Sequence, residues 1–345
     1  MAKKEEKLNY VELARALKST GPQRLYLLYG QEDYLLEQFM GEIRALCAPD
    51  GADDFGYHRL DGATLTMREL SEAVNALPFL SERTLTEVRG FDLNRCREED
   101  VPQLESILSD IPDFATLAFV QSGDFEPDLR RRTIKAAKKY GSVVNFTSQG
   151  QGALLPWIRK RFAAAGKVVD SAAAAELIYV SGDLMNGLIP EIEKISAAVP
   201  GDTVTRADVD KYAHHLPESK VFDMTDRLAE KDIDGACRLL AELLSTGEEP
   251  IKTLAVIGQQ MRRLYAARLA IDRKLGANFV VELCGIKYGF VADKLMKAAR
   301  GFTLPQLRRA VELCVETDYA MKSTASGDGE LLRELFIRLS VGESA

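Results

Sequence analysis

Residues 25–37, with the sequence LYLLYGQEDYLLE, decide the fold of the first part of the chain. The run of large apolar residues from Leu25 to Tyr29 predicts a buried strand that ends at Gly30. From Asp33 to Leu46 the apolar residues recur with helical spacing. A buried strand, a glycine and a helix in this order are typical of the start of an α/β domain.

The same alternation of strand and helix continues to about residue 146. Further strands are expected at Phe55–Leu60, Arg83–Val88, Ala115–Val120 and Ser142–Phe146, and helices at Leu65–Asn75, Leu104–Leu108 and Glu126–Lys139. Strands separated by helices predict βαβ units and a largely parallel sheet with helices on both faces. We therefore expect an α/β domain over residues 1–149.

Two breaks divide the rest of the chain into helical parts. Small polar residues at 147–152 predict a linker, and a second break comes at 216–219, where the sequence is LPES. Between the breaks, helices are expected at 154–165, 172–180, 184–199 and 206–214, which would form a small domain over 150–216. Beyond residue 221 the pattern is helical almost throughout, as in the stripe Leu254, Ile257, Met261 and Leu264. We expect a helical domain over 217–345.

Composition excludes several classes of protein. The 345 residues include 45 Lys and Arg against 52 Asp and Glu, a formal charge of −7, so contact with nucleic acid would have to be local or shared with partners. No apolar run approaches the ~18 residues that a membrane span needs, and the N-terminal residues do not have the pattern of a secretory signal. These features favour a soluble, cytoplasmic protein.

The sequence indicates neither a metal site nor a catalytic site. The five cysteines are far apart, and none has the spacing of zinc ligands. His214 and His215 are adjacent, so their side chains point apart, and solvated linker positions are expected for both. No Gly-x-Ser-x-Gly motif is present.

The loop after the first strand has the position of a phosphate-binding loop but not its residues. Such a loop needs GxxxxGK[ST], in which backbone N–H groups and Lys meet the phosphates and Ser or Thr holds magnesium. Here Gly30 is followed by QEDYLLE, without the second glycine, the lysine or the hydroxyl. Glu32 and Asp33 would place negative charge beside a phosphate, at a cost of about 1 kcal/mol per like charge even in water. The acidic residues suit a helix N-terminus, so we expect a structural N-cap.

An apolar segment at 76–83, ALPFLSER, follows the helix expected to end at Asn75. Pro78 cannot continue that helix and restricts Leu77 to extended geometry, so Phe79 and Leu80 would project together from a loop. On composition alone, packing of these residues against their own sheet is the more common outcome. The functional alternative is an apolar plug that fills a pocket on a partner protein.

Six basic residues occur on the helix expected at 126–139. They are Arg130, Arg131, Arg132, Lys135, Lys138 and Lys139. A solvated face is the simpler interpretation, and a surface that contacts DNA phosphates is the alternative, with Arg130, Arg131, Lys135 and Lys138 as its candidates.

Five segments, in this order and spacing, give the whole chain a family resemblance. They are LLYGQEDYLLE at 27–37, LPFLSER at 77–83, VFDMTD at 221–226, LLSTGEEPI at 243–251 and DYAMKS at 318–323. The sequence resembles the delta subunits of bacterial DNA polymerase III, the clamp-opening subunits of clamp loaders, in their Gram-positive form.

The resemblance implies an architecture, a set of partners and a binding site. The architecture is a degenerate AAA+ module, with a RecA-like α/β core and a helical lid, followed by a helical collar. The partners are the sliding clamp (beta subunit), the gamma/tau and delta-prime subunits, and primed DNA held by the assembled complex. No cofactor and no catalysis are implied. The family's clamp contact corresponds here to Phe79 and Leu80, with Leu77 beside them.

Two other classes of function remain open at this point. A true AAA+ NTPase with an atypical phosphate loop would bind nucleotide in isolation. A non-catalytic helical scaffold would use Phe79 and Leu80 for folding, so replacing them would lower stability without affecting any partner.

Overall fold

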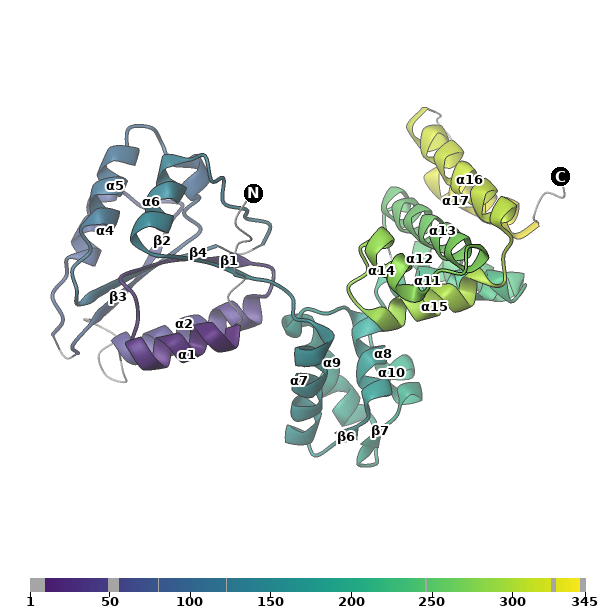
Figure 1. Cartoon of the computed structure of the whole chain (residues 1–345), viewed down its shortest axis with the longest axis horizontal. Coiled ribbons are helices and arrows are strands. Elements are labelled where there is room, and N and C mark those ends of the chain that lie inside the picture. The colour runs from purple at the N-terminus through teal and green to yellow at the C-terminus, as the bar shows by residue number, and fades with distance from the viewer. Residues whose placement is uncertain are drawn as a thin grey trace. The chain divides into compact units, whose positions relative to one another are not determined.

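The structure is a computed structural model, which describes residues 10–48, 56–79, 81–121, 123–245, 247–323 and 327–341. The chain divides into two compact units (Figure 1). The first comprises residues up to 148 together with 184–186, and the second comprises 149–183 and the residues from 187 onward. Among the residues that the structure describes, no helix combines the length and the apolar character that crossing a membrane requires.

A five-stranded parallel sheet forms the centre of the first unit. Its strands are β1 (Leu25–Gly30), β2 (Tyr57–Asp61), β3 (Thr84–Arg89), β4 (Ala115–Val120) and β5 (Ser142–Phe146). They lie in the order β2-β3-β4-β1-β5. Leu27 of β1 is aligned with Phe119 on one side and with Val143 on the other, so the strand that opens the α/β pattern is internal. The parallel α/β core predicted from the sequence is confirmed.

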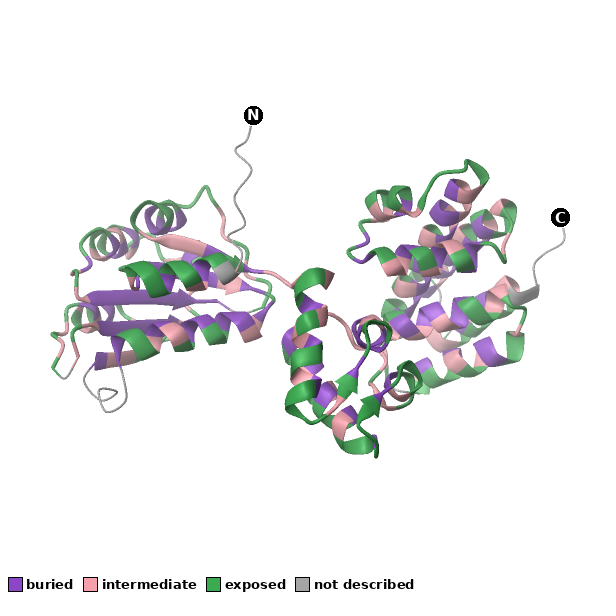
Figure 2. Cartoon of the chain, turned by 60° about the horizontal axis from the view of Figure 1, so that its bottom comes forward, coloured by how far each residue is buried: buried purple, intermediate pink, exposed green. Residues whose placement is uncertain are grey.

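Helices cover both faces of this sheet. They are α1 (Tyr10–Thr20), α2 (Asp33–Cys47), α4 (Met67–Val74), α5 (Val101–Ser109), α6 (Arg132–Tyr140) and the short 3-10 helix η1 (Leu93–Arg95). Figure 1 shows α4, α5 and α6 on one face and α1 and α2 on the other. Leu27 shares a core cluster with Leu70 of α4 and Ile134 of α6. Tyr26 packs edge-on against Phe39 of α2, with 5.7 Å between the ring centroids. Most of β1, β3 and β4 is buried between these layers (Figure 2).

Helix α6 begins six residues later than the sequence pattern predicts. The predicted start was Glu126, but the helix begins at Arg132. Asn94 holds the residues before the helix, because its side chain donates to the carbonyl of Glu126 (2.9 Å) and accepts from the backbone N–H of Asp128 (2.8 Å). These residues are therefore held as a loop by a residue more than thirty positions away. Helix α1 is an element that the sequence pattern did not predict, and Phe55 lies outside the described residues.

The second unit is almost wholly helical. Its helices are α7 (Gln151–Ala164), α8 (Ser171–Ser181), α9 (Met185–Ala198, from residue 187), α10 (Arg206–Tyr212), α11 (Pro217–Ala229), α12 (Ile233–Ser245), α13 (Pro250–Asp272), α14 (Ala277–Cys284), α15 (Gly289–Ala299), α16 (Leu304–Ser323) and α17 (Asp328–Val341). A short parallel pair, β6 (Val168–Val169) and β7 (Thr203–Val204), joins two of their loops.

Helix α13 is the central helix of the C-terminal part. It contacts α11, α14, α15, α16 and α17. The apolar stripe expected on it is buried, with Leu254, Ile257, Met261 and Leu264 each at most 3% exposed. This confirms the all-α class predicted for the C-terminal residues. Since residues 149–183 and 187–345 form one compact unit, the division of the chain into domains at 1–149, 150–216 and 217–345 stays a proposal.

Candidate partner-binding site

Helix α4 has a defined beginning and a defined end. At its start, Glu69 N donates to Thr66 Oγ1 (3.2 Å) and Thr66 N donates to Glu69 Oε2 (2.9 Å), which forms a capping box. At its end, Asn75 Nδ2 donates to the carbonyl oxygen of Ser71 (2.8 Å). These contacts satisfy polar groups that a helix leaves without partners at its ends. The chain therefore leaves the helix at a fixed point, just before the apolar segment.

Leu77 and Phe79 lie on the surface directly after α4. Leu77 is 76% exposed and Phe79 is 73% exposed. Among the large apolar side chains that the structure describes, Leu77 is the most exposed, and Tyr319 equals Phe79. Large apolar side chains at these exposures do not contribute to their own core, which is the property that a partner-binding plug requires. Leu80, expected to accompany Phe79, lies outside the described residues.

The tip that carries these side chains is anchored where it re-enters the sheet. Ser81 Oγ donates to the carbonyl of Arg83 (2.6 Å), and the guanidinium of Arg83 lies 3.5 Å from the carbonyl of Pro22. Thr84, the first residue of β3, donates its N–H to the carbonyl of Phe114 (2.9 Å). These contacts fix the residues that follow the tip, and ordered flanking residues reduce the conformational entropy that binding costs.

The residues after β1 do not fit a nucleotide, the ligand expected of the AAA+ module that the sequence resemblance implies. The lysine and hydroxyl of a phosphate-binding loop are absent, and Glu32 is fully buried there. No strand of the sheet, as far as the structure describes them, ends in a pair of carboxylates suited to magnesium. Strand β3 instead ends in Arg89, whose guanidinium donates two hydrogen bonds to Glu37 of α2 (2.6 and 2.9 Å).

The basic candidates near α6 are partly neutralised by carboxylates. Arg130 forms two hydrogen bonds with Asp128 (2.9 and 3.1 Å), which lower the pKa of that carboxyl to about 2. Arg131 lies 3.6 Å from Glu98. Lys135 and Lys138 are exposed on α6. The four candidates thus lie on one stretch of chain, but the two arginines each have an acidic neighbour.

Arg130 and Arg131 also line a pocket of about 140 Å³ beside η1. The pocket includes Glu98, so its wall carries charges of both signs. Arg132 lines it as well, so three arginines accompany one carboxylate, and the pairing of Arg130 with Asp128 and of Arg132 with Glu105 offsets part of that positive charge.

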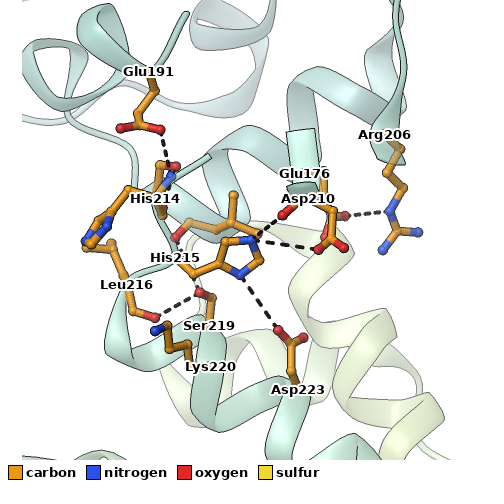
Figure 3. Close-up of polar contacts among 12 residues, drawn as sticks. Glu176, Glu191, Arg206, Asp210, His214, His215, Leu216, Ser219, Lys220 and Asp223 are labelled. Carbon is orange, nitrogen blue, oxygen red and sulfur yellow. Dashed lines mark hydrogen bonds and ion pairs between the residues drawn. The ribbon is translucent and has the colours of Figure 1, made fainter. Parts of the chain in front are cut away.

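His215 does not occupy the solvated position that the sequence suggests. Its side chain is 17% exposed, and its Nε2 lies 2.9 Å from the carbonyl oxygen of Asp210. Figure 3 shows the ring between Asp210 and Asp223, with Nδ1 3.9 Å from the Asp223 carboxylate. Burial, with Asp210 and Asp226 nearby, raises the pKa of Asp223 to about 6, although His215 opposes this shift. His214 is exposed, and its backbone N–H donates to Glu191 (2.7 Å).

The structure places neither histidine in a group of metal-ligating side chains. In the part of the chain that the structure describes, no group of three or more His, Cys, Asp or Glu side chains is arranged to hold a metal ion. The polar cluster around His215 is a structural junction between α10 and α11. Sequence spacing gave no signal for it, because its members come from separate helices.

Comparison with known proteins gives consistent matches. Over 332 residues, the chain is 24% identical to "DNA polymerase III subunit delta" of Bacillus subtilis (strain 168), with 94% of each chain covered. It is 23% identical over 319 residues to the protein of the same name from Escherichia coli (strain K12), covering 91% of this chain and 90% of that one. A solved structure, "Bacillus subtilis DNA clamp loader delta protein", superposes with a TM-score of 0.54 at 21% identity, covering 96% of this chain and 100% of that chain. At this identity, the structural match shows a shared fold.

Two models of a single family match separate parts of the chain. Residues 26–147 match "DNA polymerase III, delta subunit", and residues 218–339 match "DNA polymerase III delta subunit, C-terminal domain". These ranges cover the parallel sheet with α2 to α6 and nearly all of the helices from α11 onward. Together they include more than half of the residues, and the chain therefore belongs to the DNA polymerase III delta subunit family.

Proposed function

We propose that this chain binds the sliding clamp of its replication machinery and opens the ring for loading onto primed DNA. The observation that carries the proposal is the exposure of Leu77 (76%) and Phe79 (73%) at the interrupted end of α4. Leu80, between Phe79 and the anchored Ser81, is proposed as the third member of this plug. Aromatic and aliphatic anchors of this kind supply much of the binding energy when they fill a pocket on a partner.

Binding energy at the plug can be converted into ring opening without any reaction on this chain. A closed ring and an open ring are two states of the clamp, and a protein favours the open state only if it binds that state more tightly. The plug would bind a pocket on the clamp, and α4, which precedes the plug in the chain, would press on the ring. We infer that the chain has no catalytic activity of its own, since the loop after β1 does not fit a nucleotide.

Membership of the family supports proposals for the remaining partners. We propose that residues 217–345 act as a collar that holds the chain in a ring with gamma/tau and delta-prime subunits. Residues 1–149 and 150–216 would form the core and the lid of a degenerate AAA+ module. Primed DNA would be held by the assembled complex, with Arg130, Arg131, Lys135 and Lys138 as candidate contacts. A cytoplasmic location is proposed on the same basis, because chromosome replication takes place there in bacteria.

A pull-down with the purified sliding clamp tests the proposal. The wild type should retain the clamp, and the double variant Phe79→Ala plus Leu80→Ala should lose it with its melting temperature nearly unchanged. If the double variant unfolds more easily but still binds the clamp, a scaffold function replaces the clamp-binding one. If the wild type binds ATP in isolation, the NTPase alternative gains support.

A further inference from the structure

Glu32 has an unusual position in the loop after β1. The loop turns at Gly30, whose φ of +132° suits glycine, and a Cβ there would lie 2.2 Å from the carbonyl oxygen of Phe146. The backbone of Glu32 is fixed on both sides, since its N–H donates to that carbonyl (3.0 Å) and its own carbonyl accepts from Leu36 (3.2 Å). The side chain is 0% exposed. A carboxylate is thus buried in the segment that has the position of a phosphate-binding loop, between β1 and α2.

The side chain of Glu32 does not cap the helix that it precedes. Glu32 is the N-cap residue of α2, as the sequence predicts, and Asp33 lies in the first turn, but the carboxylate of Glu32 makes no capping hydrogen bond to that helix. Both carboxylate oxygens instead lie 3.3 Å from the backbone nitrogen of Met185. Met185 is the first residue of α9, and residues 184–186 belong to the same compact unit as Glu32.

This contact has the chemistry of phosphate recognition, with the anion supplied by the protein. The first N–H groups of a helix lack partners within the helix and carry partial positive charge, so they bind anions. A buried carboxylate needs such donors, because burial of an unpaired charge is costly. Glu32 and the start of α9 therefore satisfy each other: the carboxylate gains a donor, and Met185 N–H gains an acceptor.

We propose that Glu32 is an internal anion that replaces a nucleotide phosphate, holding residues 184–186 in the first unit without any nucleotide. The side chain that excludes a phosphate from the loop after β1 thereby also removes the need for one. This inference does not depend on clamp binding, because it concerns a contact within one unit of the isolated protein.

Hydrogen exchange at the Met185 amide tests the proposal in the full-length chain. In the wild type this amide should be protected, and its protection should be the same with and without magnesium and ATP. In Glu32→Ala its exchange should be faster by about tenfold or more, as expected for loss of a hydrogen bond to a charged acceptor. Asp33→Ala, which removes the adjacent carboxylate, should leave the exchange of Met185 unchanged.

The variant Glu32→Gln covers the case in which Glu32→Ala fails to fold. It keeps the size of the side chain and one acceptor oxygen but not the charge, so Met185 should exchange at a rate between those of the wild type and the alanine variant. Either of two results would overturn the proposal. One is wild-type exchange at Met185 in folded Glu32 variants, and the other is protection in the wild type that requires ATP.

Discussion

The ammonium nitrogen of Lys294 lies 3.2 Å from the ring centroid of Tyr179, over the face of the ring. The same nitrogen is 3.2 and 3.3 Å from the two carboxylate oxygens of Glu176, which also accepts from Arg206 (2.9 Å). Lys294 is on α15, whereas Tyr179 and Glu176 are on α8. One cation thus joins residues on both sides of the break at 216–219, inside the second compact unit.

Replacing Lys294 with Met should destabilise the second unit. The side chain of Glu176 is 9% exposed and that of Lys294 is 28% exposed, so the pair is largely shielded from water. Loss of the ammonium removes the cation–π contact and leaves Arg206 as the remaining ion-pair partner of Glu176. The free energy of unfolding should fall by about 1–3 kcal/mol. Urea denaturation measures this change. Lys297→Met, on the exposed side of the same helix, is the control, and an equal effect of both substitutions would contradict the expectation.

Asp223 should make stability depend on pH in the acidic range. Burial raises its pKa to about 6 in the folded protein, from about 4 in an unfolded chain. Between these values the folded state keeps a proton that the unfolded state has released, so the contribution of Asp223 to stability falls as pH rises from about 4 to about 6. His215 and Lys294 limit the shift, whereas Asp210 and Asp226 increase it.

The variant Asp223→Asn provides the measurement. Its free energy of unfolding, relative to that of the wild type, should increase as pH rises from about 4 to about 6 and then level off. Comparing the two proteins cancels most of the contribution of other carboxyl groups. A difference that stays constant over this range would show that Asp223 titrates normally.

Glu87 should contribute to the stability of the first unit through its ionised form. It is fully buried in β3 and accepts hydrogen bonds from Tyr57 (2.7 Å), Arg44 (3.1 Å) and Arg89. Burial alone would raise its pKa, but these donors leave the pKa below its usual value. Glu87→Gln should therefore cost about 2–4 kcal/mol at neutral pH.

The effect of Glu87 on stability should become smaller in acid. A lowered pKa contributes stability above the unfolded value of about 4.5, and that contribution is lost as pH falls below it. Thermal melting of Glu87→Gln and the wild type should therefore differ less at pH 3 than at pH 7. Glu99→Gln, at an exposed position, should melt like the wild type at both values.

The lysines of α6 offer a test of DNA contact in the assembled clamp loader. If Lys135 and Lys138 each contact a phosphate, replacing both with Ala should reduce the number of counterions released on primed-DNA binding by about two. This number is measured from the slope of the logarithm of the binding constant against the logarithm of the salt concentration. Lys18→Ala, at an exposed position of α1, should have no effect. An unchanged salt dependence in the double variant would remove Lys135 and Lys138 from the DNA surface.

The local spacing of apolar residues was sufficient to predict the strands of the sheet and most of the helices. Strand β1 and helix α2 follow each other in the sequence with an apolar run and a helical stripe, so adjacent residues carried the whole signal. The same is true of the tip at 76–79, where Pro78 ends a helical pattern. That pattern does not predict whether Leu77 and Phe79 are exposed or buried. Only the family resemblance favoured exposure.

Polar contacts between residues far apart in the sequence could not be predicted from local patterns. Asn94 contacts the loop before α6, and the carboxylate of Glu32 contacts Met185, a residue 153 positions away. The surroundings of His215 likewise come from α10 and α11 together. Such contacts form only after the fold brings distant segments together, so residue spacing carries no signal for them.

The affinity of the isolated chain for the purified sliding clamp, measured by surface plasmon resonance, is the most direct test of the proposed function. Leu77→Ala plus Phe79→Ala should weaken binding by about thirtyfold or more, the loss of about 2 kcal/mol expected for hot-spot residues. Tyr319→Ala, which removes an equally exposed aromatic ring from the C-terminal helices, should bind like the wild type. Clamp binding by the Leu77 and Phe79 double variant at wild-type affinity would contradict the account.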